Sequence, residues 1–419
     1  MPADEFSLRR IAVPAYGPTL LYGLATGAIL PVIALSARGL GATVALAALV
    51  ITLTGVGSLL TNVPATVVTT RFGEKWALVA ASVWCALAMV LAASVPVLWV
   101  FALAVFMVGM AGSVFGLARQ SYLTEAVPAH FRARALSTLG GVNRIGVFIG
   151  PFAGAAAIHF LGTSGAYWVG AVAALCAGVL SLQVPELTAR PARPARRGGS
   201  DRSAATDPAV LPPPTVRSIL RSHGRVFRTV GIGVLLIAAV RATRQAVIPL
   251  WGQHIGLDPT QTALIYGLSG AIDMLIFYLA GKAMDTWGRR SVAVPCMLIM
   301  GAGLGLLPLA SSATGLLLAA LLIGFGNGIG SGIVMTLGAD FSPSPGRPQF
   351  LGIWRLLADL GTMGGPGILS GVTALFSLST GIAATALLGL AGALVLRRWV
   401  PGGRPGRAAS DGPDHRPAG

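Results

Sequence analysis

Long apolar segments alternate with short polar breaks along most of the chain. The segments are about 20 residues long, which is the length that an α-helix needs to cross the hydrocarbon core of a bilayer. The period-two alternation of a membrane β-barrel is not found in them. We therefore predict an all-α integral membrane protein with twelve transmembrane helices, at residues 14–36, 43–69, 76–95, 97–119, 137–160, 165–185, 229–251, 260–281, 291–310, 313–337, 350–375 and 379–398.

Composition supports lipid as the solvent of this chain. Charged residues make up 11% and apolar residues 54% of the sequence, whereas soluble domains contain about 25% charged residues. The net charge of +16 would suit nucleic-acid binding in a soluble protein, but the basic residues lie at the ends of apolar segments and in one central stretch. We expect a lipid bilayer around the protein and no nucleic-acid partner.

The basic residues also indicate the orientation in the membrane. If the N-terminus is inside, the outer loops hold only Arg38. Cytoplasmic loops are enriched in Lys and Arg, so this bias predicts a multi-pass protein of the inner (cytoplasmic) membrane with both termini in the cytoplasm. The inner loops then contain Arg71, Lys75, Arg132, Arg134, Lys282, Arg289, Arg290 and Arg347.

A single offset of 215 residues relates the two halves of the chain. The matching pairs are Gly73 and Gly288, Lys75 and Arg290, Gly109 and Gly324, Glu125 and Asp340, Pro128 and Pro343, Arg132 and Arg347, Gly146 and Gly361, Gly150 and Gly365, and Pro151 and Pro366. Each copy holds six spans and starts inside, so the two repeats are parallel. We predict six-helix bundles at residues 1–185 and 229–400 around a central cavity.

The stretch between the bundles, residues 186–228, is rich in Pro, Arg, Gly and Ser. Such a composition cannot bury a core and predicts a flexible basic cytoplasmic linker. Its last part, residues 215–228, interleaves apolar residues with arginines, which suits a short helix on anionic lipid and equally a disordered segment. The tail at 401–419 is predicted to be disordered and cytoplasmic.

A loop motif ends the eighth predicted span. Gly281, Asp285, Gly288, Arg289 and Arg290 follow the order G-x-x-x-D-x-x-G-R-R, which resembles the loop signature of the major facilitator superfamily. The resemblance implies a transporter whose two bundles open a central cavity to each side of the membrane in turn. Glycines permit a tight turn, and an acid beside arginines can pair in one state and separate in another, so we expect a cytoplasmic gate here.

The equivalent loop of the first half is degenerate. Thr66 and Thr70 replace the first glycine and the aspartate, so we expect this side of the gate to latch less strongly. Arg119, at the inner end of the fourth span, is expected to join the cytoplasmic charge cluster rather than to contact a substrate. The other predicted gate residues are Arg71, Gly73, Glu125, Arg132, Asp340 and Arg347.

Glycine and proline also occur together inside two spans. The fifth span contains Gly146, Gly150, Pro151 and Gly154, and the eleventh contains Gly365 and Pro366. Glycines allow close helix packing and proline removes a backbone hydrogen bond, so both helices are expected to bend. The fifth-span pattern resembles the G-x-x-x-G-P-x-x-G motif of proton-coupled exporters in the superfamily, which implies export.

Six charged residues lie inside predicted spans: Arg144, Arg241, Arg244, Asp273, Arg355 and Asp359. Each costs at least about 2.5–3.5 kcal/mol on insertion scales and is therefore expected to be functional. Arg144 and Asp273 lie at similar depths, and the superfamily packs their two helices together, so we predict that they pair. Arg355 and Asp359 are four residues apart and can meet on one helix face.

These charges suggest two roles. Asp273 and Asp359 are candidate proton carriers, although each could instead only neutralise a buried arginine. The excess of arginines suits recognition of an anionic group, because a guanidinium offers a fork of donors to a carboxylate or phosphate.

The leading functional hypothesis is a monomeric secondary active transporter that exports a small organic solute in exchange for protons. Proton-coupled uptake of an organic anion is the alternative, and a transporter-like receptor without transport is a weaker one. No phosphate-binding loop, His-rich metal motif or Ser/His/Asp arrangement is present, so we expect no enzyme activity, no metal and no cofactor.

Overall fold

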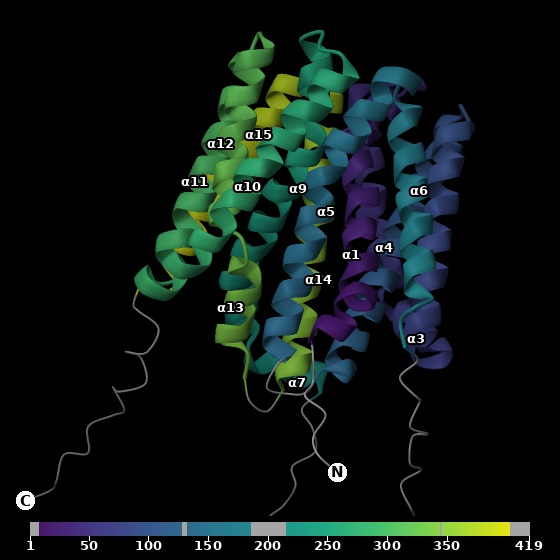
Figure 1. The fold of residues 1–419 in the computed structure, drawn as a ribbon. Helices are drawn as coiled ribbons and strands as arrows, with labels where there is room; N and C mark the ends of the chain where they lie inside the picture. Colours follow the sequence, from purple (N-terminus) through teal and green to yellow (C-terminus); the bar gives the residue numbers. More distant parts are fainter. Residues whose placement is uncertain (1–7, 128–131, 186–214, 344–345, 403–419) are drawn as a thin grey trace, which may run out of the picture.

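The computed structural model describes residues 8–127, 132–185, 215–343 and 346–402, and within these ranges it contains helices and no strands. Figure 1 shows α1, α3, α4 and α6 on one side of the molecule, α10, α11 and α12 on the other, and α5, α9 and α14 between them. At some helical positions, such as 281 and 285, the structure describes the backbone only.

The first half contains six spans in six helices. The helices are α1 (Leu8–Ile29), α2 (Ile33–Gly39), α3 (Val44–Ser94), α4 (Leu98–Ala126), α5 (Arg132–Leu161) and α6 (Ser164–Ser181). α1 and α2 form one span with a 41° bend. α3 holds two spans, which are separated at Gly73, where φ is 81° and the helical dihedrals are interrupted.

The second half contains the other six spans. Its helices are α9 (Val230–His254), α10 (Pro259–Trp287), α11 (Arg290–Leu306) with the short 3₁₀ helix η2 (Leu307–Leu309), α12 (Ala313–Ile329), α13 (Ile333–Phe341), α14 (Arg347–Leu375) and α15 (Leu378–Trp399). The span predicted at 313–337 is broken between α12 and α13, where Gly332 has a φ of 83°. The predicted fold of two six-helix repeats is confirmed.

Eight of the described helices are long and apolar enough to cross a membrane by themselves, and the bent α1–α2 pair raises this number to nine. α3 counts once in that number although it holds two spans. The long helices α10 and α14, which carry Asp273 and Asp359, are not among those eight helices.

The 215-residue repeat is visible in the backbone. Two pairs of glycines at this offset have positive φ angles: Gly41 (88°) and Gly256 (82°), and Gly73 (81°) and Gly288 (88°). Thr43 and Asp258 are equivalent N-caps, and each side chain accepts a hydrogen bond from the backbone N–H three residues later. The two copies therefore turn at the same places.

Glycines bring equivalent helices into backbone contact in each half. A Cβ atom on Gly109 would overlap the carbonyl oxygen of Thr54, and one on Gly324 would overlap that of Ser269. These two contacts are again related by 215 residues. In lipid there is little hydrophobic drive between helices, so such close approach is a main source of their association.

The last part of the predicted linker is helical. It forms α7 (Val216–Ser222), which Thr215 caps, and α8 (Gly224–Arg228). Ile219 and Phe227 are buried, and the Phe227 ring lies 4.8 Å from the ring of Phe350 near the start of α14. Residues 186–214 and 403–419 lie outside the described residues.

The two halves pack through α3 against α14 and through α5 against α10. At one end of these interfaces, Ser370 Oγ of α14 donates a hydrogen bond of 2.7 Å to the carbonyl oxygen of Ala45 in α3. A small buried apolar cluster joins the halves at the same end, with residues Val32, Leu35, Ala155, Ile158, Ala166 and Ala263. The central cavity lies further along the bundle.

Candidate functional site

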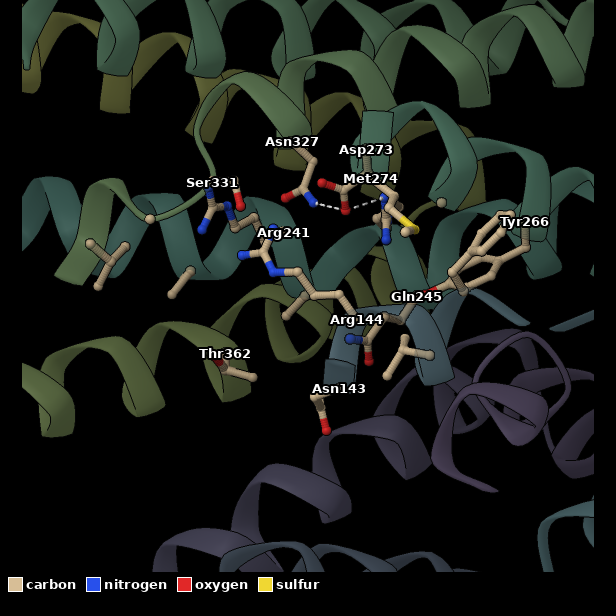
Figure 2. Close-up of a pocket in the computed structure, with 18 of the residues that line it drawn as sticks. Asn143, Arg144, Arg241, Gln245, Tyr266, Asp273, Met274, Asn327, Ser331 and Thr362 are labelled. Atoms are coloured by element: carbon tan, nitrogen blue, oxygen red, sulfur yellow. Dashed lines mark hydrogen bonds and ion pairs between the residues drawn. The ribbon is translucent and has the colours of Figure 1, made fainter. Parts of the chain in front are cut away.

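A cavity of about 500 Å³ lies between the halves. Its walls come from α5, α9, α10, α12, α13 and α14. The polar lining residues are Asn143, Arg144, Arg241, Arg244, Gln245, Tyr266, Asp273, Asn327, Ser331 and Thr362 (Figure 2). The volume falls within the range of about 300–1,000 Å³ for small-molecule sites. Four of the six intramembrane charges predicted from the sequence therefore share one cavity.

Asp273 is the centre of the polar network in this cavity. Its Oδ2 atom lies 3.7 Å from Arg244 Nη1 and accepts a hydrogen bond of 2.5 Å from Asn327 Nδ2 (Figure 2). The guanidinium of Arg244 also lies over the Tyr266 ring, 5.4 Å from its centroid. A carboxylate in this position is held by one cation and one amide from two different helices.

Arg144 and Arg241 extend toward the same part of the cavity (Figure 2). Arg241 donates to the carbonyl oxygen of Gly330. Arg144 interacts electrostatically with both Asp273 and Arg241. The sequence predicted Arg144 beside Asp273, and the structure brings the two into one cavity; Arg244 is a further neighbour of Asp273 that helix depth alone did not indicate.

The break between α12 and α13 makes the Arg241 contact possible. Gly332 has a positive φ, which glycine adopts without a steric penalty, and the chain leaves the helix at Gly330. Helix ends leave carbonyl groups without intrahelical partners, and the Gly330 carbonyl oxygen accepts from both the Ile333 N–H and the Arg241 guanidinium. The glycine-rich sequence from 324 to 332 is the signal for this break that the span prediction did not use.

Arg355 and Asp359 lie in a second, smaller pocket of about 380 Å³ between α3, α4 and α14. The two side chains interact electrostatically. Asn62 Nδ2 donates to Asp359 Oδ2 at 3.5 Å, and Ser113 Oγ donates to Asn62 Oδ1 at 2.6 Å. Asn62 and Ser113 belong to the first half, so this network crosses the interface between the halves.

Arg119 points into the bundle. Its Nη1 atom donates a hydrogen bond of 2.7 Å to Asn143 Oδ1, and its guanidinium lies 5.9 Å from the centroid of the Phe115 ring. Phe115 stacks on Tyr22, with ring centroids 4.0 Å apart. Asn143 lines the central cavity, so the described contacts of Arg119 lead to the cavity and not to the predicted cytoplasmic cluster.

The gate motif of the second half forms an ion pair. Arg289 Nε lies 2.9 Å from Asp340 Oδ2, and Arg289 Nη1 donates to the Met284 carbonyl oxygen at 2.8 Å. Gly288 makes the turn before Arg289 with a φ of 88°. Arg290 lines a shallow pocket with Arg397.

The first-half gate has different chemistry. Glu74, which the offset aligns with Arg289, accepts a hydrogen bond of 2.9 Å from Ser121 Oγ. Arg71 lies 5.7 Å from the neighbouring Phe72 ring and Glu125 is exposed, as is Arg347 in the second half. For Gly281, Asp285 and Arg132 the structure describes only the helical backbone.

The predicted helix-bend residues are close-packed. A Cβ on Gly146 would overlap the Leu20 carbonyl oxygen. Cβ atoms on Gly150 and Gly154 would approach backbone atoms of residue 28 to 2.5 and 2.8 Å. Gly365 lies against the Ala239 carbonyl oxygen of α9 in the same way. Pro151 lines the central cavity, and Pro366 lies within α14.

Comparison with known proteins gives one family. The model described as Major Facilitator Superfamily matches residues 19–281 and 230–418. A search of curated proteins gives no significant match.

Solved structures resemble this chain over nearly its whole length. A D-xylose-proton symporter aligns with a TM-score of 0.70 at 17% identity, covering 94% of this chain and 98% of the symporter. An inward-facing bacterial homolog of the human lysosomal transporter Spinster gives 0.70 at 12%, covering 94% and 97%. The human organic anion transporter MFSD10 gives 0.64 at 15%, covering 93% and 99%.

Proposed function

The chain belongs to the major facilitator superfamily of secondary transporters, and we propose that it exports a small organic solute by proton-coupled alternating access. The two-bundle fold with a cavity between the halves supports alternating access. The observation that carries the coupling is Asp273, because it is the one acidic side chain among the described residues that line the cavity. The solute, protons and the lipid bilayer are the partners, and a monomer is the functional unit.

Asp273 is the proposed proton carrier. A carboxylate that exchanges a nearby arginine for solvent or solute changes its proton affinity, since an opposite charge favours its ionised form. The neighbours of Asp273 lie on three helices other than α10. They are the arginines Arg244 and Arg144 and the neutral amide of Asn327. Movement of these helices during alternation would therefore load and release a proton at a position next to the solute.

Asp359 receives a different role in this proposal. Its hydrogen bond from Asn62 joins the two halves, and it does not line the central cavity. We assign it to stabilising the state in which α3 and α14 are in contact. A rearrangement of the halves breaks this bond, whatever solute is carried.

Export is favoured by the close-packed glycines and the proline of α5, which match the exporter-like pattern in the sequence. Proton-coupled uptake is the second candidate, and it is favoured by the arginines of the cavity, which suit an anion. The structural neighbours carry solutes of different chemistry, a sugar and organic anions among them, so they do not decide between these directions.

Solute-driven proton movement in proteoliposomes tests the proposal. The purified protein is reconstituted with an internal pH dye, and solutes are added outside. Antiport predicts alkalinisation of the interior as the solute enters and protons leave, whereas symport predicts acidification. Solute uptake without any pH change would contradict proton coupling, and acidification would replace export by uptake.

The membrane orientation is a separate part of the proposal. The basic inner loops support cytoplasmic termini in the inner membrane. Labelling of single cysteines with a membrane-impermeant reagent in intact cells, at Arg38 and at Arg71, tests it. We expect labelling at position 38 only. Labelling at position 71 only would show that the orientation is the opposite one.

A further inference from the structure

We propose that the solute bound in the central cavity is a small organic anion, whose carboxylate or phosphate group lies between Arg144 and Arg241. This inference rests on the proposed function, because it names the class of solute for the same cavity. It is carried by the charge balance of the walls and by the position of Asp273.

The cavity walls have an excess of positive charge. Within the part of the chain that the structure describes, three arginines line the cavity and Asp273 is the one acidic lining residue. The Asp273 carboxylate lies 3.7 Å from Arg244 and attracts Arg144 as well, while Arg144 and Arg241 repel each other. Charged side chains in a membrane interior cost several kcal/mol unless an opposite charge is near. An anionic solute would supply the charge that the walls do not contain.

Arg241 is positioned to bind the anionic group of the solute. The Arg241 side chain donates from Nη2 to the Gly330 carbonyl oxygen and contacts the Cys296 thiol, while its Nε atom is buried and has no hydrogen-bond partner among the residues that the structure describes. A guanidinium held at one end presents its remaining donors in a fixed plane, which matches the geometry of a carboxylate or phosphate. Arg144 reaches the same part of the cavity from α5 (Figure 2).

The remaining walls fit the organic part of the solute. Phe148, Met274 and Met335 provide apolar surface, and Tyr266 adds an aromatic face with Arg244 over it. Thr362 and Gln245 offer uncharged polar contacts. A cavity of about 500 Å³ holds a compound of small-metabolite size with one charged end.

Removal of the Asp273 carboxylate should change the affinity for anions and for cations in opposite directions. An anionic solute and the Asp273 carboxylate would compete for the same guanidinium groups, whereas a cationic solute would need that carboxylate. Replacing Asp273 by Asn therefore predicts tighter binding of anions and weaker binding of cations. A purely structural role of Asp273 would change both in the same direction.

The test measures binding to the purified protein by thermal stabilisation and calorimetry. The panel contains aryl and alkyl carboxylates, sulfonates and phosphate monoesters, each with a neutral amide and an amine of the same skeleton. We expect stabilisation by anions, a loss of about 10- to 100-fold in affinity in Arg241→Gln and Arg144→Gln, and a smaller loss in Arg241→Lys, which keeps the charge but not the fork. Arg221→Gln, at an exposed site on α7, is the matched control and should bind as the wild type does.

Asp273→Asn is expected to bind the same anions more tightly, and it decides the question if an arginine variant fails to fold. A panel in which amines or amides bind and anions do not, or in which no anion binds, overturns the inference. Anion binding without solute-driven proton flux would leave the inference standing and remove the coupling proposal. Proton-coupled transport of amines alone would support the coupling proposal and overturn the inference of an anionic solute.

Discussion

In the first half Gly146 of α5 lies against the Leu20 carbonyl of α1, and in the second half Gly361 of α14 lies against the Leu235 carbonyl of α9. Both members of the contact are shifted by 215 residues. The same correspondence relates the Gly109 and Gly324 contacts. Close packing of backbones thus follows the repeat, because either half needs it to hold its helices together in lipid.

Several charges do not follow the repeat, although the loop charges Lys75 and Arg290, Glu125 and Asp340, and Arg132 and Arg347 do. Asp359 stands where the first half has Arg144, and Arg289 stands where the first half has Glu74. The central cavity takes three of its four charged residues from the second half. Packing therefore restricts both halves equally, whereas the chemistry of binding and gating is divided between them.

The strongest test of the shared packing is to add a methyl group at equivalent glycines. Gly146→Ala and Gly361→Ala would each push a Cβ into a carbonyl oxygen of the facing helix. Overpacking typically costs about 1–3 kcal/mol, and these contacts are with backbone atoms, which give way less easily. We expect both variants to yield little monodisperse protein after detergent extraction, as measured by size-exclusion chromatography.

Two neighbouring glycines serve as controls. A Cβ on Gly141 of α5 or on Gly364 of α14 would meet no described atom within 4 Å. Gly141→Ala and Gly364→Ala should be recovered at wild-type yield. If Gly146→Ala folds normally while Gly361→Ala does not, the halves do not share this packing requirement.

Asp273 in the central cavity and Asp359 in the smaller pocket each lie near an arginine. Arg244→Gln removes the described ion-pair partner of Asp273, and the two side chains are only 13% and 20% exposed. Breaking a fully buried pair costs about 3–5 kcal/mol; this pair is partly exposed and 3.7 Å apart, so we expect about 1.5–3 kcal/mol. Denaturant titration of the solubilised protein measures the loss.

Arg355→Gln is the matched change in the smaller pocket. Arg355 is more exposed than Arg244 and has no ion pair with Asp359 among the described contacts, so its removal should cost less than that of Arg244. An equal loss of unfolding free energy in Arg244→Gln and Arg355→Gln would mean that the two clusters contribute alike to stability. That result would contradict the expected difference between them.

The smallest expected effect is at the gates. The pair of Arg289 and Asp340 is partly exposed, with 18% and 43% of the side chains accessible, so a double-mutant cycle should give a coupling of about 0.2–1 kcal/mol. In the first half, a cycle between Glu74 and Ser121 measures a hydrogen bond to a carboxylate without an ion pair. We expect high salt to weaken the coupling of Arg289 with Asp340 more than that of Glu74 with Ser121. The reverse salt dependence would contradict this expectation.

Sequence reasoning found the spans, the repeat and the intramembrane charges, because hydrocarbon makes apolar length and buried charge unambiguous. It did not find Asn62, Ser113 or Asn327, since a neutral polar residue in an apolar helix carries little signal. The partners of a charge also depend on helix rotation. Depth placed Arg144 near Asp273, but the contact of Arg244 with Asp273 required the packing of α9 beside α10.

The most direct test compares Asp273→Asn with Asp359→Asn in proteoliposomes, with solute exchange and proton flux recorded on the same preparation. We predict that Asp273→Asn still exchanges solute but no longer moves protons, and that Asp359→Asn keeps proton flux tied to solute. Undiminished solute-driven proton flux in Asp273→Asn would contradict the assignment of the central cavity as the coupling site.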